Sequence, residues 1–167
     1  MAKKLRSVRS ESTRGFTLVE LMVTVAVLGI LLGIATPSLV ELIRHNRIAT
    51  VSNEILGLVQ YARSEAVKRA EDVDVVLANP GSEWTAEAKE TTAGNAVLRA
   101  INNSGSVNLS AAQTLTFNYL GRLDPLSTIT LGLSLTADSG ISRKVIIEPS
   151  GRSCVRKESE TIDCGES

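Results

Sequence analysis

Residues 16–35 read FTLVELMVTVAVLGILLGIA, an apolar run that contains one acidic residue, Glu20. Twenty helical residues span about 30 Å, which is the thickness of the hydrocarbon core of a bilayer. Residues 1–15 precede this run and carry a net charge of +4. The positive-inside rule therefore predicts that residues 1–15 lie in the cytoplasm and the chain after the span lies outside. The sequence thus predicts a membrane-spanning helix over 16–36.

The carboxylate of Glu20 is unusual inside such a segment, because it costs at least about 2.5 kcal/mol even on lenient insertion scales. One interpretation is that Glu20 reaches the interface, since it lies about one turn inside the run. The other is that cleavage between Gly15 and Phe16 creates an α-amine four residues before Glu20. That amine could pair with Glu20 of a neighbouring subunit, and the charge would then select partners and register.

This part of the chain resembles the type IV pilin and pseudopilin family. The match consists of Gly15, Phe16, Thr17, Leu18 and Glu20, followed by the apolar stretch and Pro37. The resemblance implies that a prepilin peptidase cuts after Gly15 and methylates Phe16, and that Glu20 acts in assembly. It also implies storage in the inner membrane as a single-pass protein with a periplasmic head, and a place in the pilus after assembly. The predicted leader is 1–15, and the predicted head is 37–167.

Apolar residues continue with helical spacing beyond the span, at Ile48, Val51, Ile55, Leu58, Val59, Ala62 and Ala66. This pattern predicts one long helix from about Phe16 to about Ala70. Its second half, 37–70, is amphipathic and needs a covering layer. A bend is expected at Pro37, whose ring removes a backbone donor and clashes with the preceding turn. His45 has polar neighbours, which favours a solvated helix surface over a metal site.

The run NRIATVSNEILGLVQYARSEAVKR, residues 46–69, resembles the GspH/FimT branch of minor pilins and pseudopilins. The residues that carry this resemblance are Asn46, Arg47, Leu56, Leu58, Tyr61, Ala62, Arg63, Ser64, Glu65 and Ala66. It implies a FimU-like or FimT-like pilus protein, or a GspH-like component of type II secretion.

The hydrophobic period changes after Val73, and we expect six or seven short antiparallel strands packed on the amphipathic helix. The predicted fold class is α+β, with a long N-terminal helix packed on an antiparallel sheet over 73–167. The segment 86–95 is expected to form a surface loop, and Trp84, Phe117 and Tyr119 are expected in the core or on a sheet face. The predicted strands are 73–78, 83–86, 96–101, 114–120, 128–135 and 143–149.

Two cysteines, Cys154 and Cys164, lie ten residues apart. Zinc would need more ligands, and the chain has one histidine, far away in sequence. A thioredoxin-type motif needs two intervening residues. A disulfide is the simplest interpretation, and it predicts an oxidising compartment and a contribution of about 3 kcal/mol. No metal ion or cofactor is expected.

Two similar glycine turns occur at 120–125, LGRLDP, and 150–154, SGRSC. One interpretation is a pair of β-turns, each with an exposed arginine. The other comes from FimT-like proteins linked to DNA uptake, which carry a C-terminal Gly-Arg-x-Arg motif. By that resemblance Arg152, Arg156 and Lys157 would contact phosphates, although Cys154 stands at the position of the second arginine. The cysteine pair is more similar to a FimU-type minor pilin.

Composition and motifs narrow the function. The chain after residue 15 has 13 basic and 17 acidic residues, which is not typical of a general nucleic-acid binder. The head has no histidine after His45 and no phosphate-binding loop, so no enzyme is expected.

The expected function is a minor pilin whose head contacts other minor pilins near the fibre tip and helps to start assembly. The expected partners are other pilins, prepilin peptidase and the inner membrane. The alternatives are a DNA-binding pilin and a pseudopilin of type II secretion.

Overall fold

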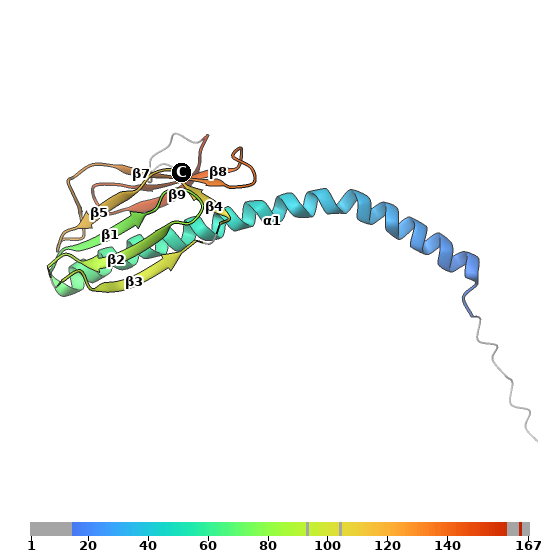
Figure 1. Cartoon of the computed structure of the whole chain (residues 1–167), viewed down its shortest axis with the longest axis horizontal. Coiled ribbons are helices and arrows are strands. Elements are labelled where there is room, and N and C mark those ends of the chain that lie inside the picture. Colours follow the sequence, from blue (N-terminus) through green and yellow to red (C-terminus); the bar gives the residue numbers. More distant parts are fainter. Residues whose placement is uncertain (1–14, 93, 104, 160–163, 165–167) are drawn as a thin grey trace, which may run out of the picture. The chain divides into compact units, whose positions relative to one another are not determined.

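The computed structural model describes residues 15–92, 94–103, 105–159 and 164. The chain divides into two compact units, Met1–Val40 and Glu41–Ser167. A single helix, α1 (Leu18–Arg69), runs through both units, and the strands follow it in the second unit (Figure 1). The long helix and the antiparallel head confirm the predicted α+β class.

The part of α1 in the first unit is exposed and apolar. Judged by length and composition, α1 is the one helix in the described residues that could cross a membrane. The segment stays helical through Pro37, and the bend expected there stays a prediction. The predicted limits of the leader and the span also stay predictions.

The part of α1 in the second unit buries one face. Side chains at the predicted apolar positions from Ile48 to Ala66 are almost fully buried, which confirms the amphipathic pattern. The helix ends at Arg69 because Ala70 takes a left-handed conformation, with φ of 56°. The Glu71 N–H then donates to the Ala66 carbonyl at 3.3 Å, as in a Schellman motif.

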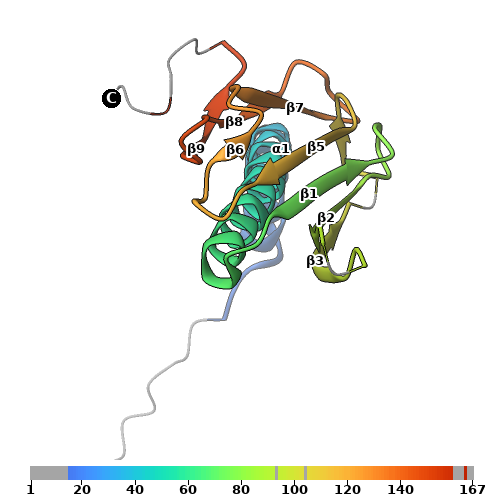
Figure 2. The same cartoon turned by 90° about the vertical axis from the view of Figure 1, so that its left-hand side faces the viewer.

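Nine strands among the described residues form two antiparallel sheets, which lie around the helix of the second unit (Figure 2). The five-stranded sheet has the order β3-β2-β1-β5-β6, and the four-stranded sheet has the order β4-β7-β8-β9. The strands are β1 (Val73–Ala78), β2 (Thr85–Glu90), β3 (Val97–Asn102), β4 (Val107–Leu109), β5 (Gln113–Phe117), β6 (Leu123–Asp124), β7 (Ile129–Leu135), β8 (Ser142–Ile147) and β9 (Ser153–Lys157).

The predicted number of strands, six or seven, is too low, since the described residues form nine strands. The strands β4, β6 and β9 were not predicted. β4 and β6 are only three and two residues long, which is too short to give a periodic pattern. β9 contains Cys154 and basic residues, which were interpreted as a disulfide and possible DNA contacts. The predicted strand 83–86 is displaced: β2 begins at Thr85 and occupies half of the predicted loop 86–95. Its inward residues are alanines, so the buried positions carry little hydrophobic signal.

Large side chains fill the space between α1 and the sheets. Trp84 and Phe117 are buried, as predicted, and the Trp84 indole N–H donates to the Val107 carbonyl at 3.0 Å. Tyr119 was expected in the core or on a sheet face, but it is 56% exposed. It follows β5 in the turn toward β6, where the strand alternation no longer applies.

Candidate assembly and interaction sites

The predicted cleavage site lies immediately before α1. Gly15 and Phe16 are exposed and precede the first helical residue, Leu18. The hydroxyl of Thr17 accepts a hydrogen bond from the Glu20 backbone N–H at 3.2 Å, so Thr17 caps the helix. This role was missed, although Thr17-Leu18-Val19-Glu20 has the spacing of a capping box.

Glu20 occupies the first turn of α1, at the positive end of the helix dipole. A negative charge is favoured there by the helix dipole. Cleavage after Gly15 would place the new amine of Phe16 directly before the capping residue. A cation and an anion would then lie at one helix end, and pairing with a neighbouring subunit stays a prediction.

The two glycine turns have the same hydrogen bonds. In the β5–β6 turn the Asn118 N–H donates to the Arg122 carbonyl at 2.9 Å, and in the β8–β9 turn the Glu148 N–H donates to the Arg152 carbonyl at 2.8 Å. The last residue of each loop is a glycine in the left-handed conformation, with φ of 71° at Gly121 and 79° at Gly151. Both are three-residue hairpin loops of the type that needs glycine there. The turn interpretation is therefore confirmed.

The side chain of Arg63 joins both turns to the helix. Its Nε donates to the Gly121 carbonyl at 2.9 Å, and its Nη2 donates to the Ser150 carbonyl at 3.1 Å. The Leu123 N–H also donates to the Pro149 carbonyl at 3.1 Å, which links the two sheets. Arg63 is one of the residues that carried the family resemblance, and its contacts give it a structural role.

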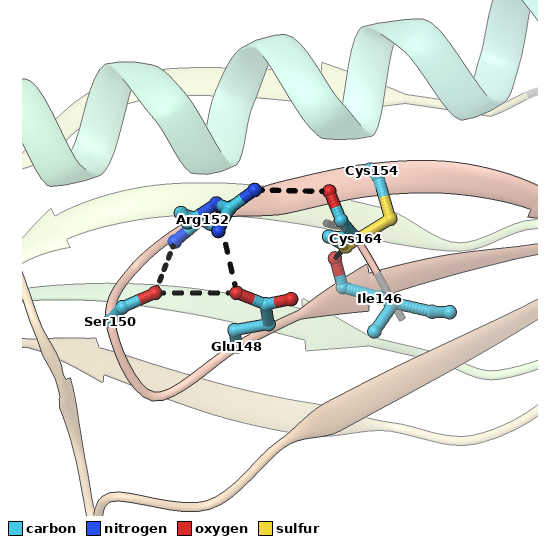
Figure 3. The surroundings of a disulfide bond; sticks show 6 residues. All are labelled: Ile146, Glu148, Ser150, Arg152, Cys154 and Cys164. Atoms are coloured by element: carbon cyan, nitrogen blue, oxygen red, sulfur yellow. Dashed lines mark hydrogen bonds and ion pairs between the residues drawn. A yellow bond between two sulfur atoms is a disulfide. The ribbon is translucent and has the colours of Figure 1, made fainter. Parts of the chain in front are cut away.

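The disulfide between Cys154 and Cys164 is confirmed. The sulfur atoms are 2.08 Å apart, and the bond attaches the chain after β9 to the second residue of that strand (Figure 3). Figure 3 also shows Arg152 beside this bond, where Nη2 donates to the Cys164 carbonyl at 3.2 Å and Nε lies 3.8 Å from a Glu148 carboxylate oxygen.

The disulfide should contribute measurably to stability. We expect the Cys154→Ser/Cys164→Ser variant to lose about 3 kcal/mol of unfolding free energy, because a short loop is no longer closed in the unfolded chain. Urea unfolding of the full chain in neutral detergent, with and without a reductant, measures this. Reductant should lower the unfolding free energy of the native chain to that of the variant, and it should not change the unfolding free energy of the variant. Equal stability of all four samples would contradict the expectation.

The three predicted DNA contacts have different surroundings. Arg152 lies before β9 and is partly compensated by Glu148, whereas Lys157 ends the strand opposite Arg143. Arg156 pairs across the ladder with Lys144. DNA binding by these residues stays a prediction.

An ion cluster fixes the end of α1. Glu65 has a side chain that is only 10% exposed; its carboxylate accepts from Arg69 Nε at 2.7 Å and lies 3.4 Å from Lys68 Nζ. Arg69 also pairs with Glu90 at the end of β2. The hydrogen bond from Arg69 is the main cause that lowers the pKa of Glu65, and partial burial opposes it.

This cluster predicts a pH dependence. The folded pKa of Glu65 lies below its usual value of 4.5, so the stabilisation is present above that value and is lost as pH falls through the folded pKa. The native chain should therefore lose more stability between pH 5 and pH 3 than Glu65→Gln. Urea midpoints at both pH values measure this, with the exposed Glu54→Gln as the matched control. Parallel losses in the native chain and Glu65→Gln would contradict the assignment.

His45 is half exposed and lies 3.8 Å from Glu41, one turn earlier, as expected for a solvated helix surface. Within the described ranges, no group of three or more His, Cys, Asp or Glu side chains is placed to hold a metal ion.

Comparison with known proteins places these features in a family. The family model described as "Type II transport protein GspH" matches residues 51–151, and the "Prokaryotic N-terminal methylation motif" matches residues 12–36. The chain is 35% identical over 88 residues to the type IV narrow pilus major component PilA5 of Thermus thermophilus, a match that covers 47% of this chain and 75% of the relative.

Two solved structures share the fold. Both are crystal structures of the type IV minor pilin FimU of Pseudomonas aeruginosa. The structure in space group P21 has a TM-score of 0.58 and 23% identity, with 69% of this chain and 92% of that chain covered. The structure in space group P65 has a TM-score of 0.55 and 24% identity, with 67% and 94% covered.

Proposed function

Because the chain belongs to the GspH family of type IV minor pilins and pseudopilins, we propose that it is a minor pilin of a type IV pilus that helps to start assembly at the fibre tip. Prepilin peptidase cuts after Gly15 and methylates Phe16. The processed helix is stored in the inner membrane, and the head then joins other minor pilins. Pilins are structural proteins, so family membership agrees with the prediction that the chain is not an enzyme.

The proposal that the chain belongs to a pilus rests mainly on one relative. The relative that is 35% identical is a component of a type IV pilus, and three quarters of its length is matched. The N-terminal arrangement supports processing as a prepilin, because Thr17 and Glu20 build a capped helix end directly behind the cleavage site. A charged amine and a carboxylate within one turn suit register selection in a bundle of apolar helices.

A second candidate is a pseudopilin of a type II secretion system. It is favoured by the description of the family model that matches residues 51–151. Both candidates share the N-terminal motif, so residue chemistry in the span does not separate them. DNA capture is not proposed, because the acidic Glu148 lies against Arg152 and acidic residues outnumber basic ones in the chain after residue 15.

Deletion of the gene separates the two candidates. In the organism that encodes the chain, we expect the deletion to reduce the number of surface pili and to leave the export of secreted proteins unchanged. Electron microscopy counts the pili, and protein analysis of the culture supernatant measures export. Normal pili with a secretion defect would favour the pseudopilin. Complementation with the native chain is the control.

A further inference from the structure

A basic cleft lies at the end of the head where α1 leaves toward residue 40. It has a volume of about 420 Å³ and is lined by His45 of α1, by residues 140–143 at the start of β8, and by residues 157–159 at the end of β9. Its cationic side chains include Arg143 and Lys157, and the acidic residue in its lining is Glu158.

The strand register explains why the cations meet. Arg143 and Lys157 are direct partners in the β8–β9 ladder, so their side chains share one face. Like charges placed directly opposite each other are destabilising. Glu158 is engaged by Lys144, at 3.5 Å, and no ion pair to Arg143 or Lys157 occurs among the residues that the structure describes. The pair is therefore suited to binding an anion.

The same end of the head has a second basic cleft. This cleft of about 380 Å³ is lined by Ile43, Arg44 and Arg47 on the helix and by residues around 105 and 136. Arg44 lies 4.0 Å from Asp138, while Arg47 is exposed. Among the described residues that line the two clefts, the basic ones are Arg44, Arg47, Arg143 and Lys157, and the acidic one is Glu158. The described linings are thus basic, although acidic residues outnumber basic ones in the chain after residue 15.

Chain connectivity keeps the two clefts within reach of the predicted membrane span. Arg44 follows Thr36, the end of that span, by only eight residues. Leu42 and Ile43 are 57% and 55% exposed, so apolar side chains continue up to the basic residues. Apolar residues beside basic ones are typical of segments that lie at a lipid headgroup layer.

We propose that the cleft of Arg143 and Lys157 binds the phosphate of anionic phospholipid headgroups. Both side chains donate charged hydrogen bonds, and phosphate oxygens accept them. Each cation near an anionic surface raises affinity about fivefold. The contact holds the head on the membrane before the chain enters a fibre. The proposal rests on the membrane anchor and goes beyond the proposed role in the pilus. A failure of lipid binding would therefore not contradict the role in the pilus, and a failure of that role would not contradict lipid binding.

Native mass spectrometry of the full chain in neutral detergent tests this site. Phosphatidylglycerol and phosphatidylcholine with equal acyl chains are titrated separately. We expect the native chain to prefer phosphatidylglycerol, and Arg143→Gln/Lys157→Gln to bind it roughly 25-fold more weakly, about fivefold for each charge. The matched control is Arg99→Gln/Arg122→Gln, which removes two exposed cations outside the cleft and should retain the preference.

A charge-preserving variant, Arg143→Lys/Lys157→Arg, separates lipid binding from folding. It should retain the preference for phosphatidylglycerol. Equal binding of both lipids by the native chain, or equal losses in the cleft and control variants, would overturn the proposal. Displacement of lipid by 10 mM inorganic phosphate would indicate a free-phosphate site instead. Binding of duplex DNA that needs Arg143 and Lys157, without lipid preference, would assign the cleft to nucleic acid.

Discussion

Replacing Gly151 by alanine is expected to destabilise the head by about 4 kcal/mol, one of the largest effects of a single substitution in this chain. The residue has φ of 79°, a conformation that L side chains rarely adopt. A Cβ atom there would clash with the Gly121 carbonyl oxygen and would lie 2.6 Å from Arg63 Nε. The two turns would have to separate, and both hydrogen bonds from Arg63 would be disturbed.

Urea unfolding of the full chain in neutral detergent measures this loss. Gly57→Ala is the matched control, because Gly57 lies inside α1 and a Cβ atom there meets nothing within 4 Å. That control should gain about 0.5–1 kcal/mol, since alanine is the better helix former. If the unfolding free energy of Gly151→Ala lies within 1 kcal/mol of the native value, the two turns can separate without loss of stability, and the expectation is wrong.

Replacing Glu20 by glutamine is expected to leave the chain in the membrane and to remove it from fibres. Glutamine has nearly the same shape as glutamate and is also accepted at the N3 position of a capping box, but it has no charge. Insertion should be as efficient as in the native chain, because the cost of a buried carboxylate is gone. The pairing with the amine of a neighbouring Phe16 would be lost, and fibre incorporation should fall at least tenfold.

Quantitative immunoblots of membrane and sheared-fibre fractions measure the distribution of the chain. Glu41→Gln is the control, because Glu41 lies on the same helix but outside the predicted span, and it should enter fibres normally. Thr17→Ala removes the helix cap and keeps the charge, so only a small loss is expected. Fibre levels of Glu20→Gln equal to the native level would contradict the role of the charge.

Much of the fold could be predicted from the sequence because two periodic signals are strong. The buried positions from Ile48 to Ala66 recur at helical spacing, and β1 is a short run of mostly apolar residues in which three of the six are valine. β2 was misplaced because its inward residues, Ala86 and Ala88, are small and therefore weakly apolar. β6 has only two residues, and its pairing with β5 depends on the glycine turn between them.

The sites divide in the same way. The cysteine pair and the two glycine turns were evident from local chemistry, and the structure confirms the disulfide and the turns. The bridging role of Arg63 was not predictable, because it joins carbonyls 58 and 87 residues away. The meeting of Arg143 with Lys157 depends on strand register, which no local pattern specified. Long-range contacts of this kind become visible only when the sheets are assembled.

The central claim is that the chain is processed as a prepilin and enters a pilus. The most direct test is mass spectrometry of the N-terminal peptide in purified, sheared pili from cells that produce the chain. We expect a peptide that begins with N-methylated Phe16, present at a low level relative to the major pilin. Detection of the chain only in membranes, with residues 1–15 still attached, would contradict the account.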